Sequence, residues 1–177
     1  MKKLMLSLSL SGLLAACAGA PQHLAETDPS GYGLFVAATN VLADSTLMVQ
    51  QQGREPVEVK IRHPGHSDTG YVIASLPPGR YNLLMYSPDG HNNYPIPTDN
   101  GWFEVQAGCF NYGGDYQFSQ GDDGMPHYTN TTTLVDIQAM PSQYKDLAKG
   151  RDLCDAGMGH PGERLKAEDV AKVMPDL

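Results

Sequence analysis

The sequence lacks the short motifs that mark several common enzyme classes. The nucleophile motif G-x-S-x-G, the zinc-protease motif H-E-x-x-H and the phosphate-binding Walker sequence do not occur in its 177 residues. Each of these motifs places a nucleophile, a metal or a phosphate against the groups that act on it. We therefore expect neither a catalytic constellation nor a cofactor, and we rank a hydrolase behind a binding or structural protein.

A long hydrophobic run is also absent. The most apolar stretch, Leu4–Leu14, is diluted by serines and a glycine. It is shorter than the ~20 apolar residues of a membrane-spanning helix. Lys2 and Lys3 precede this stretch, and Ala15 and Ala16 follow it. A basic start, a short apolar core and small residues together predict a signal peptide at residues 1–16.

The residues Leu14-Ala15-Ala16-Cys17 resemble a bacterial lipobox, in which the cysteine thiol is diacylglycerylated and the cysteine becomes the first mature residue. The resemblance implies a lipoprotein anchored through Cys17, because two or more acyl chains hold a soluble domain at a membrane. Ala18 is not the aspartate that favours retention in the inner membrane, which implies the outer membrane. The alternative is an ordinary secretory signal in which Cys17 is incidental.

Basic side chains are few, since 12 Lys and Arg stand against 20 Asp and Glu for a net charge of −8. Removing residues 1–16 takes away Lys2 and Lys3, leaving 10 basic against 20 acidic side chains and a net charge of −10. Such a surface repels phosphate backbones and anionic headgroups. Nucleic acid is therefore not an expected partner, and contact with a membrane would run through the N-terminal lipid.

The composition divides the remaining chain into three parts. Residues 17–30 contain Pro, Gly and Ala without apolar periodicity and predict a flexible, lipidated tether. Residues 31–140 carry the strand-like pattern of a β-sandwich domain. Residues 141–177 predict a helical or irregular tail, which either packs on the sandwich or projects from it as an interaction segment.

Alternating or continuously apolar runs, bounded by Gly, Pro, Asn and Asp, predict the strands of the domain. The expected strands are Gly33–Thr39, Thr46–Gln52, Val57–Arg62, Tyr71–Leu76, Arg80–Tyr86, Trp102–Ala107, Cys109–Tyr112, Tyr116–Phe118 and Tyr128–Gln138. Gly113-Gly114-Asp115 interrupts two of them, and paired glycines predict a bulge or a close backbone approach. In Arg80–Tyr86, strict alternation predicts Tyr81, Leu83 and Met85 on one face.

The stretch Gly70–Gly90 has two strand-like runs around Pro77-Pro78-Gly79. Neither proline can donate a ladder hydrogen bond and glycine can take positive φ, so the chain must turn there. This strand–LPPG–strand pattern, followed by Ser87-Pro88-Asp89-Gly90, resembles the signature of transthyretin-like and carboxypeptidase-regulatory-like β-sandwiches. Small bacterial lipoproteins carry similar modules. The resemblance covers Gly70–Phe118 and implies a mainly β, antiparallel sandwich, but no activity.

The pattern changes after Pro141. Ser142 can cap a short helix over Gln143–Lys149, and Leu165–Val173 has the spacing of a second one. The glycine-rich segment Asp152–Glu163 between them is expected to be irregular.

Cys109 and Cys154 remain after Cys17 is lipidated. An exported protein meets an oxidising compartment, where an even pair of cysteines usually bridges. A predicted Cys109–Cys154 disulfide ties the tail to the sandwich and closes a 45-residue loop (154 − 109), a constraint worth about 4 kcal/mol. The alternative is a buried free thiol at Cys109 and an unrelated Cys154.

The longest irregular segment inside the domain, Ser87–Gly101, is the first candidate for a binding loop, although it could also be a simple connection. It leads into Trp102, which alternation places on the polar side, with Phe103 and Val105 toward the core. Exposed aromatic rings could form a stacking surface for sugar rings or a peptide. The candidate binding residues are Tyr94, Trp102, Tyr112 and Tyr116. The alternative is that most of these rings pack within the sheet.

The segment from His63 to Asp68 holds two imidazoles and a carboxylate. Zinc needs three or four convergent ligands, and a Pro-Gly turn does not fix their convergence, so we expect solvated histidines and no metal site. Asp122-Asp123-Gly124 lacks the ligand spacing of a calcium loop.

These observations predict a lipid-anchored, non-catalytic binding or assembly module of the bacterial cell envelope. Its partner would be another envelope protein or a glycan. The alternative function is that of a carbohydrate- or peptidoglycan-binding accessory lipoprotein.

Overall fold

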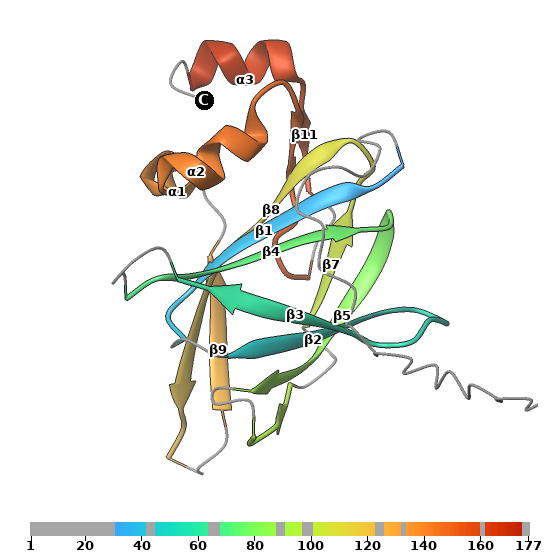
Figure 1. The fold of residues 1–177 in the computed structure, drawn as a ribbon, viewed down its shortest axis with the longest axis vertical. Coiled ribbons are helices and arrows are strands. Elements are labelled where there is room, and N and C mark those ends of the chain that lie inside the picture. Colours follow the sequence, from blue (N-terminus) through green and yellow to red (C-terminus); the bar gives the residue numbers. More distant parts are fainter. Residues whose placement is uncertain are drawn as a thin grey trace, which may run out of the picture.

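The fold is mainly β, as the sequence predicts (Figure 1). The computed structural model describes residues 31–41, 45–63, 68–87, 91–96, 101–122, 126–131, 134–159 and 162–174. The strands are β1 (Gly33–Thr39), β2 (Thr46–Gln51), β3 (Val57–Arg62), β4 (Gly70–Leu76), β5 (Gly79–Ser87), β6 (Tyr94–Pro95), β7 (Trp102–Val105), β8 (Cys109–Gln120), β9 (Pro126–Thr131), β10 (Asp152–Asp155) and β11 (Arg164–Leu165). The helices are α1 (Leu134–Ala139), α2 (Ser142–Lys145), the 3₁₀ helix η1 (Asp146–Ala148) and α3 (Ala167–Val173).

Strand β3 is shared by two parts of the sheet that pack face to face. Its residues Val57–Lys60 pair with β2, whereas Ile61 and Arg62 pair with β4. One part has the order β11-β10-β8-β1-β4-β3, with β9 also on β8; the other has the order β3-β2-β5-β6, with β7 also on β5. We call the first the covered sheet, because helices lie on its outer face, and the second the open sheet.

The antiparallel arrangement that the sequence predicts holds for most strand pairs but not for two, which are parallel. Both β1 and β10 run parallel to β8. A parallel neighbour requires a long crossover, and between β8 and β10 the chain passes through β9, α1, α2 and η1. The segment Asp152–Glu163, expected to be irregular, therefore begins with a strand, because the backbone of β10 pairs with β8.

The first hydrophobic core lies between the two sheets. Phe35 of β1 stacks on Phe103 of β7 with ring centroids 4.2 Å apart, and Phe103 is 5.5 Å from Tyr81 of β5. All three rings are buried. Phe103 and Val105 point into this core, as strand alternation predicts. This face-to-face packing of inner surfaces is that of a β-sandwich.

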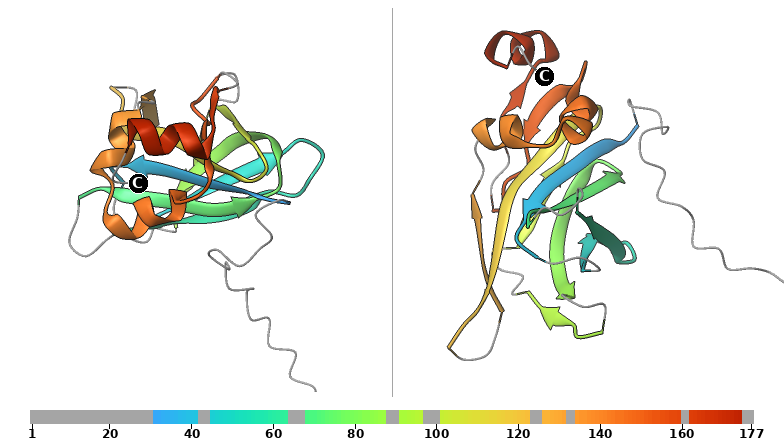
Figure 2. Two further views of the ribbon diagram at one scale, coloured as in Figure 1. Left: turned by 90° about the horizontal axis from the view of Figure 1, so that it is seen from above. Right: turned by 60° about the vertical axis from the view of Figure 1, so that its left-hand side comes forward.

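The second hydrophobic core lies between the covered sheet and the helices. The ring centroids of Tyr71 in β4 and Tyr144 in α2 are 4.8 Å apart. Ile137 of α1 and Val170 of α3 are buried in the same core. Figure 2 shows the helices gathered at one end of the covered sheet. The described part of residues 141–177 therefore packs on the sandwich.

The helix predicted over Gln143–Lys149 is present as α2 followed by η1. The predicted cap is wrong, because Ser142 is the first residue of α2 and Pro141 is its N-cap, with no side-chain hydrogen bond. The second predicted helix, Leu165–Val173, is confirmed from Ala167 onward. Leu165 itself belongs to β11, where it pairs with Leu153.

The predicted turn between β4 and β5 is held by two hydrogen bonds. The Tyr81 hydroxyl donates to the Pro77 carbonyl at 2.8 Å, and Gln51 Nε2 donates to the Pro78 carbonyl at 3.0 Å. Gly79 follows with φ of 141°, and a Cβ there would collide with the Gln51 amide. Glycine is therefore required at this turn.

Burial raises the pKa of Tyr81 to about 12, which keeps its hydroxyl protonated as a donor to Pro77.

A bulge in β5 overturns the strict alternation expected for that strand. Met48 pairs with Met85 but Val49 pairs with Leu83, so Leu84 is an extra residue. Tyr81 and Leu83 face the core as predicted, but beyond the bulge Met85 turns outward and Tyr86 turns in. One inserted residue thus moves every later side chain to the other face.

The paired glycines of β8 form the bulge that the sequence predicts. Val36 pairs with Tyr112 and Ala38 with Asp115, so two residues of β8 face one residue of β1. A Cβ at Gly113 would lie 2.6 Å from the Phe35 ring. The strand therefore continues through the glycines, and the close approach of the ring requires one of them.

The predicted strand Tyr128–Gln138 is wrong beyond Thr131, where β9 ends. The helix α1 begins at Leu134 and, with the residue after it, buries Ile137 and Met140 in the second core. A spacing of three residues places two side chains on one helical face. Packing against the covered sheet therefore overrides the β-propensity of this threonine-rich segment.

Candidate functional site

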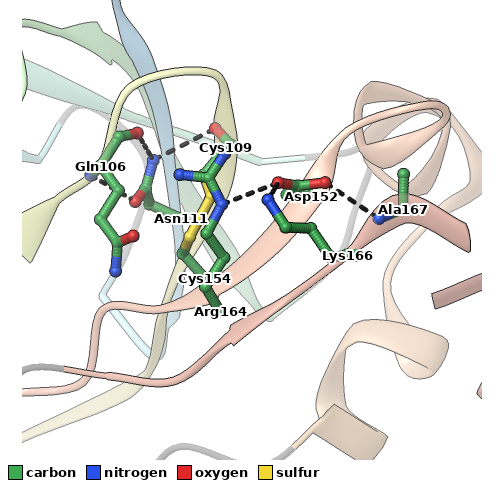
Figure 3. Close-up of polar contacts among 8 residues, drawn as sticks. All are labelled: Gln106, Cys109, Asn111, Asp152, Cys154, Arg164, Lys166 and Ala167. Atoms are coloured by element: carbon green, nitrogen blue, oxygen red, sulfur yellow. Dashed lines mark hydrogen bonds and ion pairs between the residues drawn. A yellow bond between two sulfur atoms is a disulfide. The ribbon is translucent and has the colours of Figure 1, made fainter. Parts of the chain in front are cut away.

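The predicted disulfide between Cys109 and Cys154 is confirmed (Figure 3). The two cysteines lie on the neighbouring parallel strands β8 and β10, with their Cα atoms 5.9 Å apart, and both are fully buried. A buried, bonded sulfur cannot act as a nucleophile or a metal ligand. The disulfide is therefore a structural staple that ties the C-terminal segment to the sheet.

Asn111 forms a second staple that the sequence analysis missed. Its side chain is fully buried; Oδ1 accepts from the Gln106 N–H at 2.7 Å, and Nδ2 donates to the carbonyls of Gln106 at 3.0 Å and Cys109 at 3.1 Å (Figure 3). A Cβ at Gly33 would collide with this amide. Asn111 therefore provides hydrogen-bond partners for backbone groups of the β7–β8 turn, and its role is structural.

Asp152 organises the start of α3. Its carboxylate accepts from the backbone N–H of Ala167 at 3.0 Å, from Lys166 Nζ at 3.0 Å and from Arg164 Nε at 2.7 Å (Figure 3). The backbone hydrogen bond, followed by the two cations, lowers the pKa of Asp152 to about 2. These partners lie in β11, at the N-cap of α3 and at its first residue, so this ionised carboxylate fixes the last helix and is not poised for acid–base catalysis.

The four predicted binding aromatics do not form one surface. Tyr112 is buried in the second core and Tyr116 in the first, so the expectation that they are exposed is wrong. Tyr94 is half-buried and packs against the first core, whereas Trp102 lies on the outer face of the open sheet, opposite Asn82. The bulge in β8 lies between Tyr112 and Tyr116 and turns the two rings to opposite faces of the strand. The packing of helices and of the other sheet on these faces cannot be inferred from alternation along one strand.

Instead, five rings gather at one end of the sandwich, near the C-terminal end of β8. This aromatic cluster consists of Tyr86, Tyr94, Tyr116, Phe118 and Tyr128. Phe118 is central, with ring centroids 4.5 Å from Tyr86, 6.0 Å from Tyr128 and 6.4 Å from Tyr116. The rings come from both sheets, so the cluster closes this end of the first core.

Two hydroxyls in the aromatic cluster, those of Tyr116 and Tyr128, are buried without a hydrogen-bond partner in the described part of the chain. Burial raises the pKa of both phenols, and the proximity of Tyr128 raises that of Tyr116 further. A buried hydroxyl without a partner costs stability. The aromatic cluster therefore serves to pack the core, and its two unpartnered hydroxyls slightly lower the stability of the fold.

Trp102 and Arg80 form the most distinctive pair on the outer face of the open sheet. The Arg80 guanidinium lies over the indole, 3.8 Å from the ring centroid, and Glu104 is directly opposite Arg80 on β7. Arg80 is exposed, and Trp102 and Glu104 are half-buried. The predicted outward orientation of Trp102 is therefore correct, and the structure adds a cation–π partner.

The same face carries a groove with a volume of about 180 Å³. Its walls come from β2, β3, β5 and the residue before β6. The lining residues are Thr46, Met48, Glu58, Met85, Ser87 and Asn93. Sequence reasoning missed this groove, because it depends on Met85, which only the β5 bulge turns outward.

Metal and dinucleotide motifs were also sought in the described residues. Among the residues that the structure describes, no three His, Cys, Asp or Glu side chains come together to hold a metal; residues 64–67 and 123–125 lie outside that part. The spacing G-x-G-x-x-G occurs at Gly157–Gly162, but it links β10 to its antiparallel neighbour β11. A dinucleotide fingerprint instead joins a strand to a helix.

Comparison with family models, with curated proteins and with solved structures finds no match to this chain. The likeness to transthyretin-like lipoproteins stays a prediction from the LPPG motif. Cys17 lies outside the described residues. None of the described helices has the length and hydropathy needed to cross a bilayer.

Proposed function

We propose that this chain is a lipid-anchored, non-catalytic binding or assembly module of the bacterial cell envelope, and that it contacts another envelope protein through the outer face of the open sheet. The observation that carries the proposal is the Arg80–Trp102 pair on a face that no described element covers. Acylation of Cys17, as its lipobox-like context implies, would hold this face near a membrane.

The two sheets differ in how their outer faces are covered. The outward side chains of the covered sheet, such as Tyr71 and Tyr112, are buried beneath helices in the second core. The outward side chains of the open sheet, such as Met48, Arg80 and Trp102, belong to neither core and stay half-buried or exposed. A sheet face that mixes large apolar and charged side chains and stays uncovered supports a protein-contact surface.

Trp and Arg are the residue types that most often dominate binding energy at protein interfaces. Here the indole supports the guanidinium, which holds both side chains in place at low entropic cost before a partner arrives. The same pair weighs against the carbohydrate alternative, because Arg80 occupies an indole face on which a sugar ring would stack. We therefore favour a protein partner over a glycan.

The proposal is tested by photocrosslinking in cells that express the full-length protein. A photoreactive amino acid at Asn82, next to Trp102 on the outer face, should yield one discrete crosslinked protein. The same amino acid at Gln143, exposed on α2 away from this face, is the matched control and should not yield that species. Loss of the Asn82 crosslink with Trp102→Ala supports the proposal. Equal crosslinking from both positions, or none from Asn82, would contradict it.

A parallel pull-down on purified peptidoglycan sacculi distinguishes the alternative. Retention on sacculi that competing sugar releases and Trp102→Ala abolishes would favour the carbohydrate-binding function over the one proposed.

A further inference from the structure

The groove on the open sheet is built from two neighbouring cross-strand rows. Met48 pairs with both Glu58 and Met85, and Thr46 pairs with Ser87. Directly paired residues on antiparallel strands point to the same side of the sheet, about 5 Å apart. The two thioethers thus form an apolar floor with a carboxylate at one side and hydroxyls beside it.

The size of the groove limits what it can hold. Pockets for drug-sized ligands and cofactors have volumes of about 300–1,000 Å³, whereas this groove has about 180 Å³. One extended side chain is therefore a better match than a cofactor or an oligosaccharide. Methionines suit such a guest, because their flexible, polarizable side chains adapt to its shape.

The polar groups of the groove can all accept hydrogen bonds. Glu58 offers a carboxylate, Thr46 and Ser87 offer hydroxyl oxygens, and Asn93 offers an amide oxygen. Ser87 is only 5% exposed, and its Oγ has no hydrogen-bond partner among the residues that the structure describes. A buried hydroxyl of this kind gains most from a guest that brings a donor into the groove.

From this lining we infer that the groove receives an arginine or lysine side chain of the protein partner. The inference rests on the proposed function and adds the chemistry of the residue that is recognised. The methylene stem lies on Met48 and Met85, and the cationic head donates to Glu58 and to the hydroxyl of Ser87. Arginine and lysine are pure donors with apolar stems, which is the complement of this lining.

The charge of the whole chain favours the same guest. The net charge is −8, and no cation is among the lining residues. Lys60 is the nearest basic residue in the register, opposite Thr46 on β3, and it is exposed. It lies on the same face as Glu58, two residues along β3, but is not a lining residue, so the charge inside the groove is that of the Glu58 carboxylate.

The experiment uses the soluble full domain with ¹³C-labelled methionine methyl groups and short peptides as probes. The peptides are Gly-Arg-Gly and Gly-Lys-Gly, with Gly-norleucine-Gly as a neutral probe of similar stem length and Gly-Glu-Gly as an acidic one. We expect the basic peptides to shift the Met48 and Met85 signals in a saturable way. Glu58→Gln should weaken the Gly-Arg-Gly affinity about tenfold, as loss of a charged hydrogen-bond partner does.

Glu104→Gln is the matched control, because it removes a carboxylate from the same face outside the groove and should leave the affinity unchanged. Ser87→Ala should weaken binding less than Glu58→Gln while keeping the fold. Equal shifts with the norleucine peptide would overturn the assignment of a basic guest, and the absence of saturable shifts would overturn the groove as a binding site. The two failures give different results. If the proposed function is wrong, no discrete crosslink forms from Asn82. If only this inference is wrong, the crosslink forms and Glu58→Gln does not change it.

Discussion

The backbone N–H of Gly159 donates a 2.8 Å hydrogen bond to the carbonyl of Trp102. Gly159 follows β10, the strand stapled by the disulfide, and Trp102 begins β7 at the edge of the open sheet. The chain after Cys154 therefore reaches across from the covered sheet and supports the backbone of Trp102, a residue of the proposed contact face. This contact links the stability of the C-terminal segment to the environment of the single tryptophan.

Removing the disulfide should destabilise the domain and alter that environment. The double variant Cys109→Ser/Cys154→Ser loses the constraint on a 45-residue loop, which should lower the free energy of unfolding by about 4 kcal/mol. Chemical denaturation followed by tryptophan fluorescence measures both effects. Intact mass of the wild type, alkylated under denaturing conditions without reductant, should show no labelled thiol at these two positions. A variant as stable as the wild type would show that the staple contributes little.

The hydroxyls of Tyr81 and Tyr116 should respond oppositely to removal. Tyr81→Phe breaks the hydrogen bond to Pro77 and should cost about 1 kcal/mol, whereas Tyr116→Phe removes a buried hydroxyl without a partner and should be neutral or stabilising. The two substitutions delete the same atom, so each serves as the control for the other in urea denaturation. A cost for Tyr116→Phe as large as that for Tyr81→Phe would contradict the assignment of the Tyr116 hydroxyl as unpartnered.

Asp152 should make stability depend on pH in the acid range. Its pKa is about 2 in the folded protein against an ordinary value of 3.8, so its contribution is present above about pH 4 and is lost as the pH falls toward 2. Asp152→Asn should therefore lower the denaturant midpoint at pH 7 but have progressively less effect as the pH falls below 4.

Asp146→Asn is the control for Asp152, because Asp146 pairs with Lys149 in an exposed ion pair of little energetic weight. A difference between Asp152→Asn and the wild type that stays constant from pH 7 to pH 2.5 would exclude the proposed linkage.

Substituting Trp102 should separate binding from folding. Trp102 is half-buried on the outer face, so Trp102→Ala should cost less than the 3–5 kcal/mol expected of a core aromatic. Capture of the crosslinked partner should weaken by about 2 kcal/mol or more. Arg80→Ala should reproduce the binding defect, because the guanidinium covers the indole. Strong destabilisation, with a blue-shifted wild-type emission that iodide quenches poorly, would instead identify Trp102 as a core residue.

The anchor is tested by Cys17→Ser. Loss of the thiol should block acylation, leaving the protein unprocessed as a precursor or soluble after membrane fractionation. Mass spectrometry of the wild-type N-terminus is the direct check on the lipid. Retention of Cys17→Ser in the membrane fraction as tightly as the wild type would contradict lipidation at this position.

The elements whose cause is local could be predicted from the sequence. The Pro77-Pro78-Gly79 turn, the bulge at Gly113 and Gly114, and the inward side of Phe103 follow from backbone restrictions and strand alternation, so all three are predictable from the chain. The pairing of Cys109 with Cys154 followed from there being two cysteines in a domain that the sequence predicts to be exported, and the structure confirms the pairing. The lipid anchor, equally local in origin, stays a prediction.

Which faces of the sheets are covered depends on contacts between distant segments and could not be predicted from the sequence. The extra residue Leu84 turns Met85 outward and opens the groove, and the covered sheet pulls Leu134–Ala139 into a helix despite its β-branched neighbours. Tyr112 and Tyr116 look like candidates for a stacking surface until helices and a second sheet close over them. Burial depends on segments far apart in the chain, so the pattern along one strand specifies two faces but not what packs against each.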